Sequence, residues 1–298
     1  MTEFTHPFDY VLTTLAALQE SGAKLRAPRS SLERLAQGGA VTARRIAEPA
    51  PSVEEQAERR PSLRRDAAPV ESSLLPAARE LPPFEPIAPT TGSKTERLAA
   101  MRGPILACTK CPNLVGSRTQ VVFGVGNPDA ELMFVGEAPG EDEDVQGEPF
   151  VGRAGQLLTK IIETMGFCRD KVYIANVLKC RPNMPPGVTG NRKPLPAEMQ
   201  TCLPYLREQI EVIQPRALVA LGATALEGLT GQTLSVGKMR GRWMEFQGIP
   251  LMVTFHPAYL LRNQAVTEKR KVWEDMLLVL ERLGHTITEK QRGYFLRA

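Results

Sequence analysis

Histidine is scarce in this sequence. Of its 298 residues 3 are histidine, namely His6, His256 and His285. A catalytic zinc ion usually has histidine ligands and one open position, so this scarcity argues against a histidine-rich catalytic metal site. Any metal that the chain binds is therefore expected to be structural.

Long apolar runs are also absent. None approaches the roughly 18 to 20 residues of a membrane-spanning helix. The opening MTEFTHPFDY lacks the basic start and apolar segment of a signal peptide. We therefore expect a cytoplasmic protein, in the bacterial cytosol at the nucleoid, without a membrane-embedded part. In that compartment the 5 cysteines are expected to be free or metal-bound, because disulfides are rare there.

The overall composition is that of a globular protein with a slight excess of positive charge. Hydrophobic residues make up 42% of the chain, an ordinary share for a packed core. The formal net charge is +4 and the isoelectric point is about 8.8. This balance is compatible with a nucleic-acid partner but does not require one.

The first hundred residues differ from the rest. FDYVLTTLAALQESGA has apolar residues at helical spacing, and a stretch rich in Pro, Ala, Arg and Glu follows from about residue 27 to 93. We expect residues 1–94 to be an extension made of a short helix and a disordered linker. The helix is a candidate docking segment for a protein partner, and the alternative is a loosely attached helix without a specific role.

From Thr95 onward, apolar strand candidates alternate with amphipathic helices. The strand candidates are ELMFVGE, VYIANVLK, RALVALG and IPLMVTF. Buried strands separated by helices indicate an α/β fold with a mainly parallel, four-stranded sheet between two helical layers. Ligands of such sheets bind beyond the carboxyl ends of the strands, so we expect site residues within 137–143, 176–181, 222–224 and 256–262.

The segment after the first strand, GEAPGEDEDVQGEPFVGRAG, is acidic and poor in bulky residues. We interpret it as a loop. No GK[ST] follows, so it is not a phosphate-binding P-loop. Its small residues predict that main-chain groups come close to a flat polar ligand, and the alternative is a tight strand-to-helix turn.

Four cysteines are spaced as metal ligands. CTKC places Cys108 and Cys111 two residues apart, Cys180 follows the second strand, and Cys202 lies in the next helix. Such a set suits zinc or an iron–sulfur cluster, and spacing alone does not choose between them. Unrelated cysteines remain the alternative. Cys168 is expected to be an ordinary free thiol.

The last strand candidate leads into TFHPAYLLRN. His256 ends the strand, and Pro257 prevents its continuation. We expect Tyr259, Leu260 and Leu261 to be pushed outward. A lone histidine is more often structural than catalytic, but this one is expected to share the sheet edge with GEAPG.

Taken together, GEAPGEDED, EPFVGRAGQLL, NVLKCRP, HPAYLLR and the four cysteines resemble the family 4 uracil-DNA glycosylases, the iron–sulfur type. The resemblance runs from about Leu98 to Leu283. It implies a domain over residues 95–285 with a C-terminal tail, 286–298. It also implies a structural [4Fe-4S] cluster on Cys108, Cys111, Cys180 and Cys202, and removal of uracil from single- or double-stranded DNA by a monomer.

The resemblance also implies roles for individual residues. Phe150 resembles the residue that stacks on uracil, and Asn176 resembles the amide that reads its edge. His256 resembles the donor to O2 as uracil leaves as an anion. Leu260 would enter the vacated base stack, and Arg262 would contact phosphate.

The acidic segment is expected to contribute the remaining groups. Glu137, Ala138 and Pro139 would line the uracil pocket. Other uracil-DNA glycosylases carry an aspartate where this chain has Ala138, so the water must be held differently. Glu137 and Glu143 are the candidate carboxylates, and the alternative role of Glu143 is to crowd C5 and exclude thymine.

The other acidic residues, Asp142 and Asp144, are expected to be solvated. Two departures from the family pattern stand out: an inserted NMPPGVTG between Cys180 and Cys202, and Ala258 in place of a common serine. Two other functions remain open. One is a module that captures uracil-containing DNA without turnover, and the other is a structural zinc protein. A covalent DNA-bonding branch uses a histidine in an inserted loop, and none lies between His6 and His256.

Overall fold

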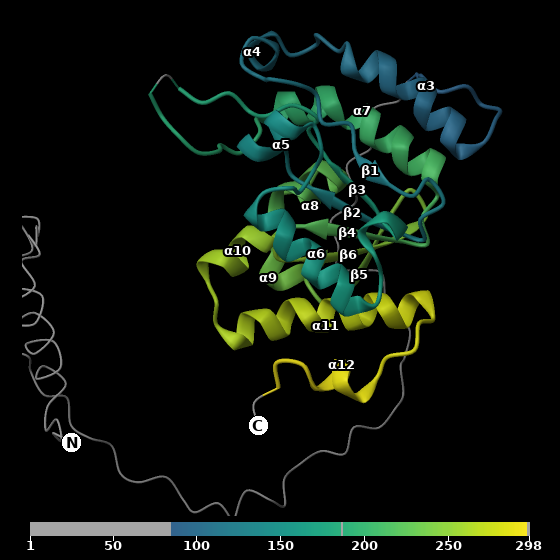
Figure 1. The fold of residues 1–298 in the computed structure, drawn as a ribbon, viewed down its shortest axis with the longest axis vertical. Coiled ribbons are helices and arrows are strands. Elements are labelled where there is room, and N and C mark those ends of the chain that lie inside the picture. Colours follow the sequence, from purple (N-terminus) through teal and green to yellow (C-terminus); the bar gives the residue numbers. More distant parts are fainter. Residues whose placement is uncertain (1–84, 186, 297–298) are drawn as a thin grey trace, which may run out of the picture. The chain divides into compact units, whose positions relative to one another are not determined.

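The computed structural model describes residues 85–185 and 187–296. The helix and linker expected within residues 1–84 lie outside this described part. Figure 1 shows the fold as a sheet with helices packed around it. None of the helices in the described residues is long and apolar enough to cross a membrane.

The four strands expected from the sequence form the centre of the sheet. They are β2 (Leu132–Gly136), β3 (Tyr173–Asn176), β4 (Ala217–Leu221) and β6 (Ile249–Thr254), and neighbouring pairs among them are parallel. The sheet has six strands rather than four, in the order β1-β3-β2-β4-β6-β5. The extra strands, β1 (Val125–Gly126) and β5 (Trp243–Phe246), pair antiparallel at the two edges. They are short and less buried, so they lack the apolar runs that reveal the central strands.

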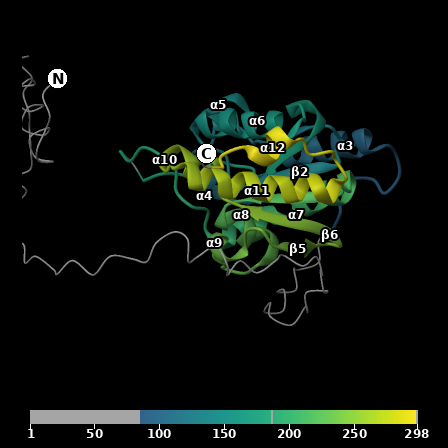
Figure 2. The same ribbon diagram turned by 90° about the horizontal axis from the view of Figure 1, so that it is seen from below.

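Both faces of the sheet are buried, because successive strand residues point to opposite sides. In β2, Met133 and Val135 join one core, whereas Leu132 and Phe134 join the other. The first core is covered by α3 (Lys94–Leu106), α7 (Pro196–Ile213), α8 (Ala223–Thr230) and α9 (Val236–Met239). The second is covered by α6 (Arg153–Met165) and α11 (Val266–Leu283). Figure 2 shows helices on both sides of the strands, as expected for three layers.

Short helices complete the chain between these elements. They are α4 (Pro112–Val115), α5 (Glu141–Gln146), the 3-10 helix η2 (Arg169–Lys171), α10 (Pro257–Arg262) and α12 (Glu289–Gly293). Three of them, α4, α5 and α10, lie in segments that the sequence marks as functional.

The packed region extends beyond residues 95–285 at both ends. The backbone N–H groups of Ile87 and Ala88 donate to Oε1 of Glu208 in α7, at 2.6 and 2.5 Å. At the other end, the indole of Trp273 donates to the carbonyl of Gln291 at 2.6 Å, and the Gln291 amide donates to the carbonyl of Thr164 at 3.0 Å. Segments on either side of that range therefore contribute buried contacts.

Candidate active site and cysteine pocket

The carboxyl ends of the parallel strands bring the expected site residues together. Gly136 at the end of β2 pairs in register with Asn176 at the end of β3. Leu221 at the end of β4 pairs with Thr254 at the end of β6, and His256 follows two residues later. The segments that leave these four strands therefore start from one edge of the sheet, as the alternating pattern predicts.

Phe150 packs on the end of β2 in a strained backbone conformation. Its φ of 55° lies in the left-handed region, which aromatic residues rarely adopt. A Cβ atom on Gly136 would lie 2.5 Å from Cζ of Phe150, and one on Gly155 would lie 1.8 Å from its carbonyl oxygen. Both glycines are therefore required for the ring to sit here. The ring centroids of Phe150 and His256 are 5.5 Å apart. Backbone strain of this kind is concentrated at functional sites.

The side chain of Asn176 faces the same space. Asn176 is only 2% exposed, and a Cβ atom on Gly136 would lie 2.3 Å from its Oδ1. Among the described residues this Oδ1 has no hydrogen-bond partner. Leaving a buried amide oxygen unpaired costs about 1–3 kcal/mol, so the site favours a ligand that donates a hydrogen bond to it.

His256 is held neutral in one tautomer. Burial, together with the charge of Arg262, lowers its pKa to about 4. Its Nδ1 accepts a hydrogen bond from the N–H of Ala258 at 3.1 Å, as the N-cap of α10. The neutral ring therefore carries its proton on Nε2, which is left as a donor.

Glu137 directly follows β2, and its side chain contacts the start of α8. Burial raises the pKa of its carboxyl group, while a hydrogen bond with Thr224 and the charge of Lys193 partly offset that effect. Thr224 lies in the first turn of α8, just after the end of β4. Glu137 thus has a shifted pKa and lies at the same edge of the sheet as Asn176 and His256. Shifted pKa values are typical of catalytic groups.

Glu143 has a different environment from the one expected for a water-positioning carboxylate. Its Oε2 accepts from the N–H of Gly140 at 3.0 Å, and its Oε1 accepts from the N–H groups of Val151 and Gly152 at 2.9 and 3.0 Å. Both oxygens are therefore engaged by the main chain on either side of the acidic segment. This geometry makes Glu143 an anchor for the backbone that presents Phe150.

The acidic segment is not the open loop that we expected. Residues 141–146 form α5, which ends at Gly147 in a left-handed conformation. Asp144 is 3% exposed and accepts from the N–H of Thr119 at 2.9 Å, so the expectation that it is solvated is wrong. Asp142 is exposed, as expected. The difference arises because the carboxylates cap backbone N–H groups instead of facing water.

The segment after His256 also differs from expectation. Tyr259, Leu260 and Leu261 are not pushed outward but form the middle of α10. Leu260 is 5% exposed, whereas Leu261 is half-buried and Arg262 is exposed. Pro257 is the first residue of this helix, a position that suits proline, so regular structure continues after β6. A wedge role for Leu260 stays a prediction, and it requires an exposure that the side chain does not have here.

The four cysteines line one pocket. It is bounded by Cys108, Cys111, Cys180 and Cys202 together with apolar side chains of α4 and the segment after β3. In the described part of the chain, no three His, Cys, Asp or Glu side chains converge on a point that would hold a single metal ion. Cys168 is exposed and apart from this pocket, as expected. The four thiols therefore line a shared pocket and do not form the ligand set of a single metal ion.

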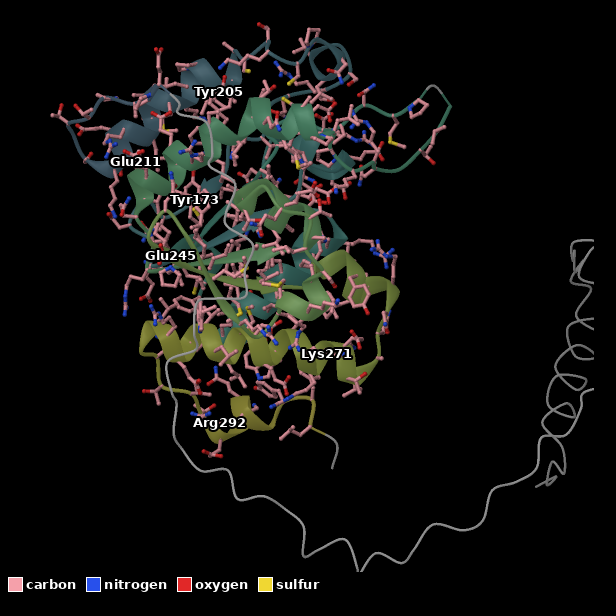
Figure 3. All side chains as sticks on the ribbon, turned by 180° about the vertical axis from the view of Figure 1, so that it is seen from behind. Tyr173, Tyr205, Glu211, Glu245, Lys271 and Arg292 are labelled. Atoms are coloured by element: carbon pink, nitrogen blue, oxygen red, sulfur yellow. The ribbon has the colours of Figure 1, made fainter. Side chains whose placement is uncertain are left out.

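Hydrogen-bond donors point at three of the sulfur atoms. Arg118 Nη1 donates to Sγ of Cys180 at 3.0 Å, and the backbone N–H of Lys179 donates to Sγ of Cys202 at 3.2 Å. The hydroxyl of Tyr205 donates to Sγ of Cys108 at 3.3 Å. Figure 3 labels Tyr205 on α7. Burial raises the pKa of the Cys180 and Cys202 thiols, and the donors from Arg118 and Lys179 offset part of that effect, which favours the thiolate form that binds metal.

Two residues near the site were not singled out from the sequence. A Cβ atom on Gly140 would lie 3.2 Å from Nδ2 of Asn191, and the charge of Lys193 reaches Glu137. Both follow the inserted NMPPGVTG. The cysteine spacing could have indicated them. If Cys180 and Cys202 bind one metal group, the chain between them must fold back to the same part of the domain.

The comparisons with known proteins agree with this arrangement. The family model described as the uracil DNA glycosylase superfamily matches residues 123–277. The type-4 uracil-DNA glycosylase of Thermotoga maritima is 45% identical over 186 residues, which cover 62% of this chain and 93% of that protein. The type-4 uracil-DNA glycosylase of Sulfurisphaera tokodaii is 40% identical over 210 residues, covering 67% and 91%.

A further relative is the type-4 uracil-DNA glycosylase of Archaeoglobus fulgidus. It is 40% identical over 173 residues, which cover 55% of this chain and 83% of that protein. The chain therefore belongs to the uracil-DNA glycosylase superfamily, and within it to the type-4 family. The family resemblance expected from the motifs is confirmed.

Proposed function

We propose that the chain is a monofunctional uracil-DNA glycosylase. It flips uracil out of DNA and hydrolyses the N-glycosidic bond, which leaves an abasic site and starts base-excision repair of deaminated cytosine. The observation that carries this proposal is the buried Oδ1 of Asn176, unpaired among the described residues and next to the Phe150 ring. A base must leave the stack before its glycosidic bond can be reached, and such a pocket suits the flipped base.

Recognition of uracil rests on the amide of Asn176. Its Oδ1 accepts from N3–H and its Nδ2 donates to O4, whereas cytosine presents the reverse pattern at both positions. A site built to pair with a polar edge rejects a mismatched base strongly, because buried groups are then left unpaired. Phe150 provides the stacking face, and Ala138 and Pro139 line the pocket beside it.

Departure of the base rests on His256. Uracil leaves as an anion with charge developing at O2, and the neutral ring offers its Nε2–H to that oxygen. Because the imidazole is already neutral and oriented by Ala258, no proton has to be moved before reaction. Preorganised donors of this kind act where charge appears in the transition state.

Glu137 is the carboxylate that supports the positive sugar and orients the attacking water. Burial raises its pKa and makes it a stronger base, while the hydrogen bond with Thr224 and the charge of Lys193 favour its ionised form. Glu143 is the weaker candidate for this role and for excluding thymine, because three N–H groups already occupy its oxygens. Arg262, exposed on α10, is the proposed phosphate contact.

The four cysteines are proposed to hold a structural [4Fe-4S] cluster. The donor set fits such a group, since four thiols line one pocket and N–H and O–H donors point at three sulfurs. A cluster there would link α4, the segment after β3 and α7 into one unit and supply no step of the hydrolysis. Anaerobically purified protein should be brown and contain iron and sulfide, and a colourless protein with stoichiometric zinc would exclude the cluster.

A single-stranded oligonucleotide that contains one uracil tests the activity. The enzyme should leave an alkali-labile abasic site, and a matched oligonucleotide with cytosine should stay intact. A protein that binds the uracil strand without creating an alkali-labile site would instead be the capture module, and one that does neither would be the structural zinc protein. We further propose that it acts as a monomer on chromosomal DNA in the cytosol, whereas a partner for the N-terminal helix remains a prediction outside the described residues.

A further inference from the structure

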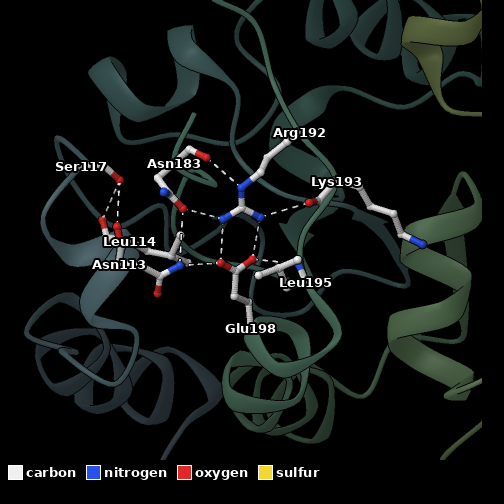
Figure 4. A network of polar contacts seen from close by, with 8 residues as sticks. All are labelled: Asn113, Leu114, Ser117, Asn183, Arg192, Lys193, Leu195 and Glu198. Atoms are coloured by element: carbon white, nitrogen blue, oxygen red, sulfur yellow. Dashed lines mark hydrogen bonds and ion pairs between the residues drawn. The ribbon is translucent and has the colours of Figure 1, made fainter. Parts of the chain in front are cut away.

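One arginine closes the inserted loop at its base. Arg192 donates from Nε to the carbonyl of Asn183 at 2.7 Å and from Nη2 to its Oδ1 at 2.6 Å. The same guanidinium group donates to both oxygens of Glu198 in α7, at 2.9 and 2.7 Å (Figure 4). Paired contacts of this kind fix geometry as well as adding energy. The two ends of the loop, Asn183 and Arg192, are therefore held together and fixed to α7.

The base of this loop lies at the candidate active site. Arg181 is 3.6 Å from Glu141 at the start of α5, and Asn191 approaches Gly140. On the other side, Lys193 is 2.6 Å from Glu227 of α8, the helix that also carries Thr224. The loop thus leaves the domain between two segments that surround Glu137. Figure 1 shows it projecting beyond α5, away from the sheet.

The tip of the loop is uncharged and partly apolar. Residues 184–190 read MPPGVTG, without an acidic or basic side chain. Val188 is 52% exposed, and Met184 is half-buried at the foot of the tip. Pro185 restricts the unfolded chain at this point and so reduces the entropy lost when its neighbours are ordered. An uncharged tip also escapes the repulsion that the carboxylates of α5 exert on phosphate.

A uracil that leaves a duplex creates a gap in the base stack. Proteins that unstack DNA commonly fill such a gap with an apolar side chain. Leu260 of α10, which the family resemblance marks for this task, is only 5% exposed. Val188, at the uncharged tip of the inserted loop, is 52% exposed, whereas the more exposed Val145, at 63%, lies in α5 among its carboxylates.

We propose that the loop from Asn183 to Arg192 is a DNA wedge whose tip enters the base stack of duplex DNA where uracil has been flipped out. The proposal rests on the proposed glycosylase function. It predicts that the loop matters for duplex DNA, where a stack must be opened, and matters little for single strands, whose bases are already accessible. Arg192 is the positioning residue, because it fixes the base of the wedge.

The test replaces residues 184–190 by Gly-Gly-Ser in the full-length protein. Single-turnover excision should slow by about tenfold or more on a uracil-containing duplex and by less than about twofold on the same single strand. Val188→Ser should show a smaller loss of the same kind. Thr189→Ala is the matched control, since it changes the same tip without removing a large apolar side chain, and it should leave both rates unchanged.

Base flipping is measured directly with 2-aminopurine beside a non-cleavable 2′-fluoro-deoxyuridine in a duplex. The wild-type protein should raise the fluorescence on binding, and the loop replacement should lower that rise. Iron content and melting temperature of the variants should match the wild type, which shows that the cysteine pocket is intact.

Three outcomes would overturn the wedge. They are equal slowing on single and double strands, no slowing on either, and a duplex-specific loss without a change in 2-aminopurine fluorescence. Failure of the wild-type protein to excise uracil even from a single strand would contradict the proposed function instead, so the two proposals fail in different ways.

Discussion

The side chain of Asn176 is buried with an oxygen that no described residue satisfies. We expect Asn176→Asp to abolish most activity on uracil, because a carboxylate repels O4 where the amide donates to it. The loss should be at least about 10²-fold, since mismatched buried polar groups are penalised strongly. Single-turnover rates on uracil and cytosine strands measure it, with the melting temperature as the check on folding. Unchanged uracil excision would remove Asn176 from base recognition.

His256 combines a catalytic and a structural contact, so its replacement needs a matched pair of variants. Asn is a good N-cap and keeps an acceptor for the N–H of Ala258, but it lacks the Nε2 donor. We expect His256→Asn to melt near the wild-type temperature and to slow the chemical step by about 10²–10³-fold. His256→Ala should show the same slowing with an additional loss of stability.

Binding to uracil-containing DNA should be nearly unchanged in His256→Asn, because the donor acts mainly on the transition state. A normal cleavage rate in that variant would show that His256 only caps α10. A parallel loss of binding and of stability would point to the same structural role.

The pKa shifts at the site assign the acidic limb of the pH profile to Glu137. Burial raises its pKa, so the active carboxylate is present above that raised value and is lost as the pH falls through it. His256 has a pKa of about 4, below the raised pKa of Glu137, so Glu137 is the first of the two groups to be protonated as the pH falls. We expect the single-turnover rate to fall on the acid side with one apparent pKa.

Lys193 supplies a directional check on this assignment. Its charge lowers the pKa of Glu137, so Lys193→Met should move the acidic limb to higher pH, and Lys193→Arg should restore it. An acidic limb that stays in place in Lys193→Met and in Glu137→Gln would mean that another group titrates.

At the scale of elements, the segment from β2 to α6 is held by one carboxylate. Glu143 joins the N–H groups on both sides of α5 and so fixes the chain around Phe150. Glu143→Gln places an NH₂ group against a backbone N–H, and hydrogen bonds to charged groups contribute about 1.5–3 kcal/mol. We expect the melting temperature to fall by about 4–8 °C and uracil binding to weaken with the displaced ring.

Glu141→Gln is the control for this change, because Glu141 is exposed on the same helix and its one ion pair within the described residues, with Arg181, is long, at 3.6 Å. It should leave the melting temperature unchanged. If Glu143→Gln melted like the wild type but lost about 10²-fold or more in the chemical step, Glu143 would act in catalysis, as the sequence first suggested.

At the scale of the whole molecule, the sequence predicts what depends on continuous patterns. The four central strands are buried apolar runs, so their carboxyl ends, and with them Gly136, Asn176 and His256, could be located in advance. The cysteine set was visible from its spacing. The side on which Leu260 lies could not be foreseen, because Pro257 starts a helix as readily as it ends a strand.

The contacts of the acidic segment were equally hidden. Nothing local distinguishes Asp142, which is exposed, from Asp144, which is buried on the N–H of Thr119. The partner comes from a distant part of the chain, and only the packed fold brings it close. The same holds for Arg192 and Glu198, whose pairing depends on where the inserted loop returns.

The limits of the domain give the last prediction. Glu208 is 2% exposed, and its Oε1 accepts from the N–H groups of Ile87 and Ala88. A chain that starts at Glu85 keeps both donors, so it should melt and excise uracil like the full-length protein. A chain that starts at Ser93 loses them and leaves a buried carboxylate without these partners, which costs about 3–5 kcal/mol. Its melting temperature should fall by about 6–20 °C.

Glu208→Gln should recover part of that loss in the shorter chain, because a neutral amide is cheaper to bury, and should destabilise the longer one. Equal melting of the two truncated chains would show that residues 85–92 add nothing to the fold, and reduced excision by the longer chain would assign the N-terminal segment a part in DNA binding.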